Sequence, residues 1–131
     1  MNAARHGGGL ILCGLLAALP GVASAQTPAA VAGKAVYESK CGGCHSVDAN
    51  RIGPLHRNII GRRVASAAGY AYSPALRRLT GVWTSARLNA WLQNPQALAP
   101  GTKMYLTVSD PAQRAAIIAY LESVSPAPAR R

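Results

Sequence analysis

The sequence predicts an all-α fold of one small domain with unusually long loops. Three segments carry helix caps or apolar residues at helical spacing, and no run of alternating apolar and polar residues is convincing as a strand. The irregular stretches 46–72 and 95–109 are long for a compact domain. Loops of this length in so small a domain are expected to wrap around something.

Residues 1–25 have the pattern of a cleavable secretory signal peptide. Arg5 and His6 precede an apolar run at residues 10–19, and Ala23-Ser24-Ala25 is an A-x-A cleavage site. The run is about half of the ~20 residues that a membrane-spanning helix needs. We therefore expect export to the periplasm without stable membrane insertion, and one domain over residues 26–124.

Four helices are expected in chain order. The Ala-rich segment 27–40 places Val31 with Ala35 and Ala32 with Val36 at helical spacing. A short helix is expected to begin at Ser73-Pro74, and a longer one runs from Thr84 or Ser85 to the Asn94-Pro95 pair. Its predicted apolar side comprises Leu88, Trp91 and Leu92.

The last helix has the clearest start signal. Asp110 is an N-cap residue, Pro111 follows at the first helical position, and Gln113 completes a capping box. Its expected apolar side comprises Ile117, Tyr120, Leu121 and Val124. Pro126 is expected to stop it, and residues 125–131 are expected to form a disordered tail.

The chain of 131 residues is strongly basic. After removal of residues 1–25, thirteen Lys and Arg and four Asp and Glu leave a net charge of +9. The basic residues are scattered, which argues against a nucleic-acid-binding motif. An acidic face of a protein partner fits this charge better.

Cys41-Gly42-Gly43-Cys44-His45 is a C-x-x-C-H string, the spacing used for attachment of c-type haem. A zinc site would need a second ligand cluster, but the predicted mature chain has no third cysteine and only His56 besides His45. A redox dithiol usually lies in a strand–helix context, which is not predicted here. The motif therefore predicts one covalent haem c.

Few residues of the chain are candidates for the second axial ligand of the iron. Neutral histidine and methionine are common haem ligands, and the expected mature chain offers His56 and Met104 besides His45. His56 lies eleven positions after His45, which is enough chain to span a haem. Both candidates stay open on this ground alone.

Taken together, residues 30–123 resemble the small class I cytochromes c of the mitochondrial and bacterial periplasmic type. The resemblance rests on the ordered motifs G-K-A-V-Y-E-S-K-C-G-G-C-H, I-G-P-L-H, I-I-G-R-R, A-G-Y-A-Y-S-P-A, G-V-W, L-Q-N-P and P-G-T-K-M. It implies the small cytochrome c fold, in which the N- and C-terminal helices cross and one or two further helices and long loops wrap one haem.

The resemblance also implies roles for single residues. Cys41 and Cys44 match the thioether cysteines, His45 matches the proximal iron ligand and Met104 the distal one. Trp91 stands where the family usually has a tyrosine near the methionine.

Further matches surround the cofactor and the helix crossing. Pro54 matches the residue whose carbonyl accepts the ring N–H of the proximal histidine. Residues that match the propionate-binding positions are Arg62, Tyr72 and Trp83. Gly33 and Tyr37 match positions that pack against the last helix at Ile117, Tyr120 and Leu121.

The function that the resemblance implies is soluble electron transport in a periplasmic respiratory chain, without enzyme activity. We expect a monomer that exchanges one electron with acidic-faced redox proteins, whether an oxidase, a reductase or a dehydrogenase. Two alternatives are the haem c subunit of a periplasmic dehydrogenase or respiratory complex, and a peroxidase or gas sensor with a labile Met104.

Overall fold

The computed structural model describes residues 26–126 and confirms the all-α prediction. Its helices are α1 (Pro28–Lys40), α2 (Pro74–Arg77), α3 (Ser85–Gln93), α4 (Pro95–Leu98) and α5 (Pro111–Ser123). Within this range the only β pairing is an isolated antiparallel bridge between Arg63 and Val82. The predicted signal peptide and residues 127–131 of the predicted tail lie outside the described residues.

Four of the five helices begin with the same N-terminal capping motif. A side-chain oxygen accepts a hydrogen bond from a first-turn N–H, and proline occupies the next position, where its missing N–H is not needed. The capping residues are Thr27, Ser73, Asn94 and Asp110. Thr84 caps α3 without a following proline. These starts therefore follow from short sequence signals.

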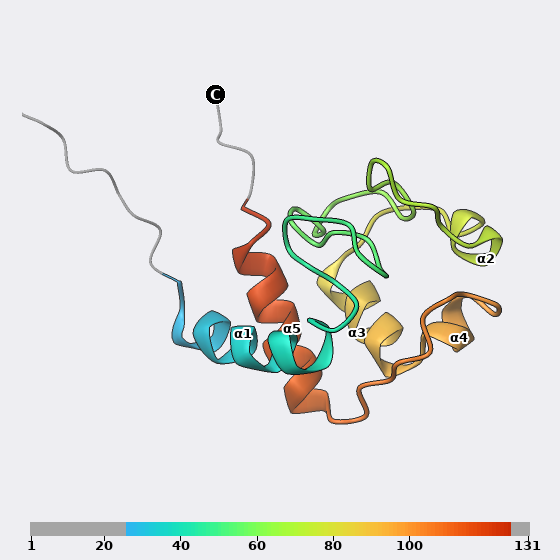
Figure 1. Cartoon of the computed structure of the whole chain (residues 1–131). Coiled ribbons are helices and arrows are strands. Elements are labelled where there is room, and N and C mark those ends of the chain that lie inside the picture. The colour runs from blue at the N-terminus through green and yellow to red at the C-terminus, as the bar shows by residue number, and fades with distance from the viewer. Residues whose placement is uncertain (1–25, 127–131) are drawn as a thin grey trace, which may run out of the picture.

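Helices α1 and α5 cross on one side of the molecule (Figure 1). At the crossing, a Cβ on Gly33 would lie 2.0 Å from the carbonyl oxygen of Ala116. The ring centroids of Tyr37 and Tyr120 are 5.0 Å apart. The close approach therefore requires glycine at position 33.

One side of α1 packs against the rest of the domain. Its buried residues are Ala30, Gly33 and Tyr37, whereas Val31 is 57% exposed. The helix expected over residues 27–40 is therefore confirmed, and Gly33 and Tyr37 pack against α5 as the family resemblance implies. The predicted apolar sides of α3 and α5 are confirmed, since all their members are buried.

Helix α4 lies in a stretch that was expected to be irregular. Asn94 ends α3 in an extended conformation, and its Oδ1 accepts a hydrogen bond from Ala97 N at 3.2 Å. Asn94 is thus both the last cap of α3 and the first cap of α4. This sharp turn directs the following segment, which carries Met104, back toward α3, where Val108 N donates to Leu92 O at 2.8 Å.

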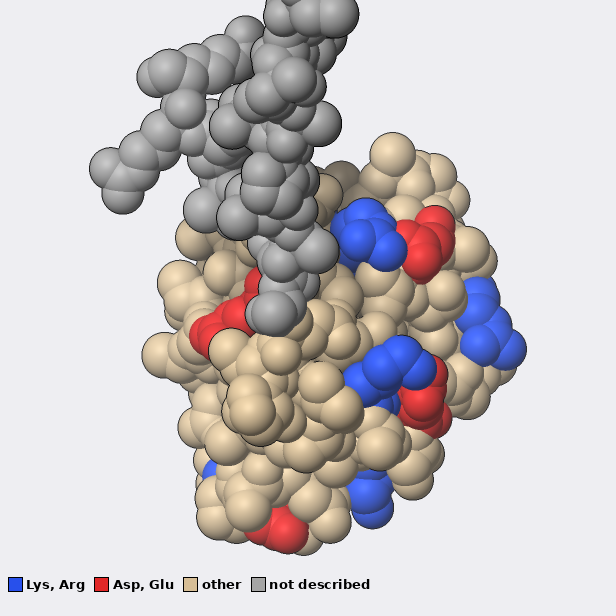
Figure 2. All heavy atoms as spheres, turned by 90° about the vertical axis from the view of Figure 1, so that its left-hand side faces the viewer, with Lys and Arg blue, Asp and Glu red and all other residues tan. Residues whose placement is uncertain are grey.

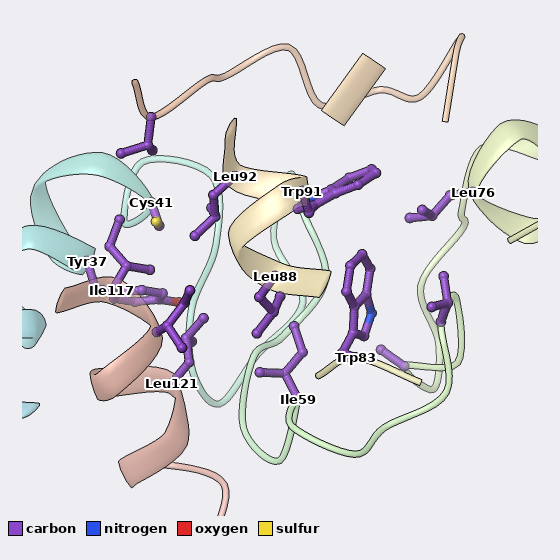
Figure 3. Close-up of a cluster of buried hydrophobic side chains, with 14 of the residues drawn as sticks. Tyr37, Cys41, Ile59, Leu76, Trp83, Leu88, Trp91, Leu92, Ile117 and Leu121 are labelled. Carbon is purple, nitrogen blue, oxygen red and sulfur yellow. The ribbon is translucent and has the colours of Figure 1, made fainter. Parts of the chain in front are cut away.

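The buried side chains gather around α3, which lies between α5 and the loops (Figure 3). Trp83 and Trp91 meet edge to face, with ring centroids 5.4 Å apart. Ile117 of α5 is fully buried in the same cluster. None of the helices within residues 26–126 has the length and apolar character needed to cross a membrane.

Candidate haem site

The core encloses a cavity of about 270 Å³ with mostly apolar walls. It is lined from α1, α3, α5 and both long loops. All eight residues that the sequence singled out for the cofactor line this one cavity: Cys41, Cys44, His45, Pro54, Arg62, Tyr72, Trp83 and Met104. Residues spread over more than sixty positions of the sequence thus line the same cavity.

The end of α1 forms the turn that carries the two thiols. Cys41 N donates to Tyr37 O at 2.7 Å, and the N–H groups of Cys44 and His45 both donate to Cys41 O, at 3.0 and 2.8 Å. Cys41 is buried and Cys44 is exposed. Burial, with a contribution from nearby Cys44, raises the pKa of the Cys41 thiol to about 11, so this thiol is neutral at pH 7.

Among residues 26–126, one ring nitrogen of His45 has a hydrogen-bond partner and the other has none. Its Nδ1 lies 2.8 Å from Pro54 O, as the resemblance implies for the proximal histidine. This bond fixes the ring and leaves Nε2 as the nitrogen that can bind a metal. Burial lowers the pKa of His45, which keeps the imidazole in the neutral form that ligation needs. A Cβ on Gly53 would lie 2.1 Å from the His45 ring, so glycine leaves the ring its space.

His56 lies beside His45. The two rings stack with centroids 4.1 Å apart and an interplanar angle of 21°. The Nδ1 of His56 is 2.9 Å from the hydroxyl of Tyr37. Burial, with further contributions from His45 and Arg62, holds the pKa of His56 well below its ordinary value. His56, which the sequence left open as a second axial ligand, thus lies directly against His45.

Met104 is half-buried, in the loop after α4. Trp91 Nε1 lies 3.2 Å from its sulfur and donates a hydrogen bond to it. Tryptophan thus supplies a donor at the position where the related family usually has a tyrosine. The side chain of Gln96 holds the backbone of the same loop. Gln96 was not among the predicted site residues, because a glutamine in a four-residue helix carries no local signal of such a role.

Arg62 has an unsatisfied donor at the cavity wall. Its Nη2 donates to Leu55 O at 2.8 Å and its Nη1 to Arg57 O at 3.2 Å. The Nε of Arg62 is buried and has no hydrogen-bond partner among the described residues. A buried donor of this kind calls for an acceptor, and a carboxylate is the preferred partner of a guanidinium.

Tyr72 and Trp83 are both buried in the same wall. The hydroxyl oxygen of Tyr72 accepts a hydrogen bond from Ala67 N at 3.1 Å, which leaves its own O–H free to donate. Two thiols, an imidazole nitrogen, a thioether and donors for carboxylates are thus present around one apolar cavity. These residues fit haem c.

A helical fold in which a C-x-x-C-H turn and a methionine line one apolar cavity defines a c-type haem protein. The family model described as Cytochrome c matches residues 30–125. The chain is 39% identical over 97 residues to the cytochrome c-type cyt cy of Rhodobacter capsulatus, which covers 72% of this chain and 49% of that protein. It is 36% identical over 95 residues to cytochrome c2 of Rhodomicrobium vannielii, which covers 70% of this chain and 75% of that protein.

Among solved structures, cytochrome cH from Methylobacterium extorquens matches with a TM-score of 0.66 and 39% identity, over 72% of this chain and 97% of that one. The chain belongs to the cytochrome c family. This membership confirms the prediction of covalent haem c, because Cys41 and Cys44 have the spacing of the attachment motif. The chain spans about half the length of several curated relatives, among them cyt cy.

Proposed function

We propose that the chain is a carrier of single electrons, with no enzyme activity of its own. The observation that carries this proposal is the convergence of His45, Met104 and both motif cysteines on one apolar cavity. When bound, haem c supplies an iron that alternates between Fe(II) and Fe(III). His45 and Met104 would hold that iron, and the apolar lining of the cavity would keep water and substrates away from it.

In this proposal Cys41 and Cys44 form the thioether bonds and His45 Nε2 is the proximal ligand. Met104 is the distal ligand in preference to His56. The support is geometric, because the ring of His56 stacks on the ring of His45, so both imidazoles lie in the same part of the cavity lining. Met104 would supply the second ligand from a different segment of the cavity lining, the loop after α4.

Arg62, Tyr72 and Trp83 are proposed to hold the propionates. The support is the unpartnered Arg62 Nε and the free O–H of Tyr72. Buried carboxylates need such donors, since an unpaired buried charge is strongly unfavourable. Pro54 acts through its carbonyl, which fixes the tautomer and the orientation of His45.

The electron partner is proposed to be an acidic-faced redox protein. All four acidic residues of the chain are engaged: Glu38 with Lys34, Asp48 with Arg57, Asp110 as the cap of α5, and Glu122 with Ser85. Figure 2 shows acidic residues next to basic ones on the side of α1 and α5. Residues 49–109 contain no Asp or Glu and eight basic residues.

Two strongly exposed residues of the cavity lining lie in this acid-free part of the chain. Ile52 and Tyr105, both cavity-lining, are 75% and 76% exposed, and Lys103 lies beside Tyr105. An apolar centre with basic surroundings suits brief contact with an acidic partner. We further propose that residues 1–25 direct export, so that the mature domain works as a monomer in the periplasm.

Stopped-flow oxidation of the reduced haem protein by an anionic and by a neutral one-electron acceptor tests both parts of the proposal. We expect single-electron kinetics with both acceptors, and a rate that falls with ionic strength only for the anionic one, because salt screens the steering field. Peroxide turnover by the purified protein would contradict the carrier role. Equal salt dependence for the two acceptors would contradict the basic docking face.

A further inference from the structure

The side chain of Gln96, on the short helix α4, holds the loop that carries Met104. Its Nε2 donates to Thr102 O at 2.9 Å and to Met104 O at 3.0 Å. Its Oε1 accepts from Gly101 N at 3.0 Å. One amide group thus joins both ends of the segment 101–104.

Gln96 lies next to a buried residue of α4, whereas the backbone of the loop at Met104 makes few hydrogen bonds. Pro95, the neighbour of Gln96 in α4, is fully buried, and Thr102 is 2% exposed. Beyond Thr102 the loop turns outward, with Tyr105 76% exposed. Within residues 26–126, the hydrogen bond from Gln96 is the only one to the Met104 backbone. The position of this backbone therefore depends on Gln96.

We infer that Gln96 is a positioning residue that keeps Met104 on the iron, an inference that rests on the proposed ligation by Met104. For the thioether to leave the iron, the loop has to move, and that movement breaks the hydrogen bonds made by Gln96. The amide thereby lowers the population of the state in which the distal position is open. It leaves the intrinsic affinity of that open position for other ligands unchanged.

Imidazole binding to the oxidised haem protein measures this population directly. Exogenous imidazole needs an open distal position, so its apparent dissociation constant is the intrinsic value divided by the open fraction. We expect Gln96→Leu to bind imidazole about tenfold more tightly than wild type, because the loop loses its side-chain bonds. Gln93→Leu is the matched control, since Gln93 is exposed at the end of α3 and should leave binding unchanged.

A second variant guards against loss of folding in the first. Gln96→Glu keeps the acceptor for Gly101 N but turns a carboxylate toward the carbonyls of Thr102 and Met104. Tighter imidazole binding is expected there as well. Far-UV circular dichroism of the haem-loaded variants establishes that the helices are retained.

A double-mutant cycle separates positioning from a general structural effect. In a Met104→Ala background the distal position is already open, so Gln96→Leu should no longer change imidazole affinity. Wild-type affinity in both Gln96 variants, or an equal effect in the Met104→Ala background, would overturn the inference. If Met104→Ala itself fails to tighten imidazole binding, the ligation by Met104 is wrong instead, so the two failures are distinguishable.

Discussion

Replacement of Gly33 by alanine tests the helix crossing on which the site is built. The added Cβ would lie 2.0 Å from Ala116 O and 3.1 Å from the Cβ of Tyr120. A carbon and a carbonyl oxygen approach to about 3.3 Å at closest. The oxygen belongs to the backbone of α5, so it cannot rotate away. The two helices must therefore move apart by roughly 1.3 Å.

The magnitude follows from two opposing effects. Overpacking of this kind costs about 3 kcal/mol, the upper end of the usual range, because the clash is with backbone. Alanine gains about 1 kcal/mol over glycine in a helix interior. The net loss is about 2 kcal/mol, which for a domain of about 100 residues lowers the melting temperature by roughly 8–16 °C.

Thermal unfolding of the haem-loaded proteins by circular dichroism measures this loss. Gly43→Ala is the control, because a Cβ at Gly43 meets nothing within 4 Å. We expect the control to melt close to wild type. A Gly33→Ala protein as stable as the control would refute the close helix approach.

Three further predictions concern single contacts. Trp91→Phe removes the hydrogen bond to the sulfur of Met104, which makes the sulfur a better electron donor to Fe(III). A redox titration should therefore show a midpoint potential lower by up to about 60 mV. An unchanged midpoint potential would argue against the hydrogen bond. In Asp110→Ala the cap of α5 is lost, and denaturant unfolding should show a loss of about 1 kcal/mol. The pKa of Asp48 lies below its ordinary value, chiefly because Arg57 donates a hydrogen bond to the carboxylate. Wild type should therefore be slightly more stable than Asp48→Asn at pH 7 and lose that advantage as the pH falls through the pKa of Asp48, and an advantage that persists at low pH would speak against the ion pair.

The helix starts and the cofactor residues could be predicted because their signals are local or strongly patterned. A capping residue followed by proline marks α1, α2 and α5 in the sequence, and C-x-x-C-H is a contiguous motif. The hydrogen bond between His45 and Pro54, implied by family resemblance, is present. The roles of these residues toward the iron and the propionates stay predictions.

The features that were missed depend on contacts between distant segments. Apolar spacing alone does not give the buried side of α1, which is set by the fit of Gly33 against α5; only the family resemblance pointed to Gly33. His56 is drawn inward by Tyr37, nineteen residues earlier in the chain. Gln96 acquires its role only when the loop after α4 folds back over it. No local pattern encodes these three relationships.

Proton NMR of the reduced haem protein tests the central claim most directly, namely that Met104 and His45 hold the iron of a covalent haem c. A methionine bound to low-spin Fe(II) lies over the haem plane, where the ring current shifts its methyl resonance far upfield. The account predicts one such three-proton resonance in wild type and none in Met104→Ala. Its absence from wild type, or its persistence in Met104→Ala, would contradict the account.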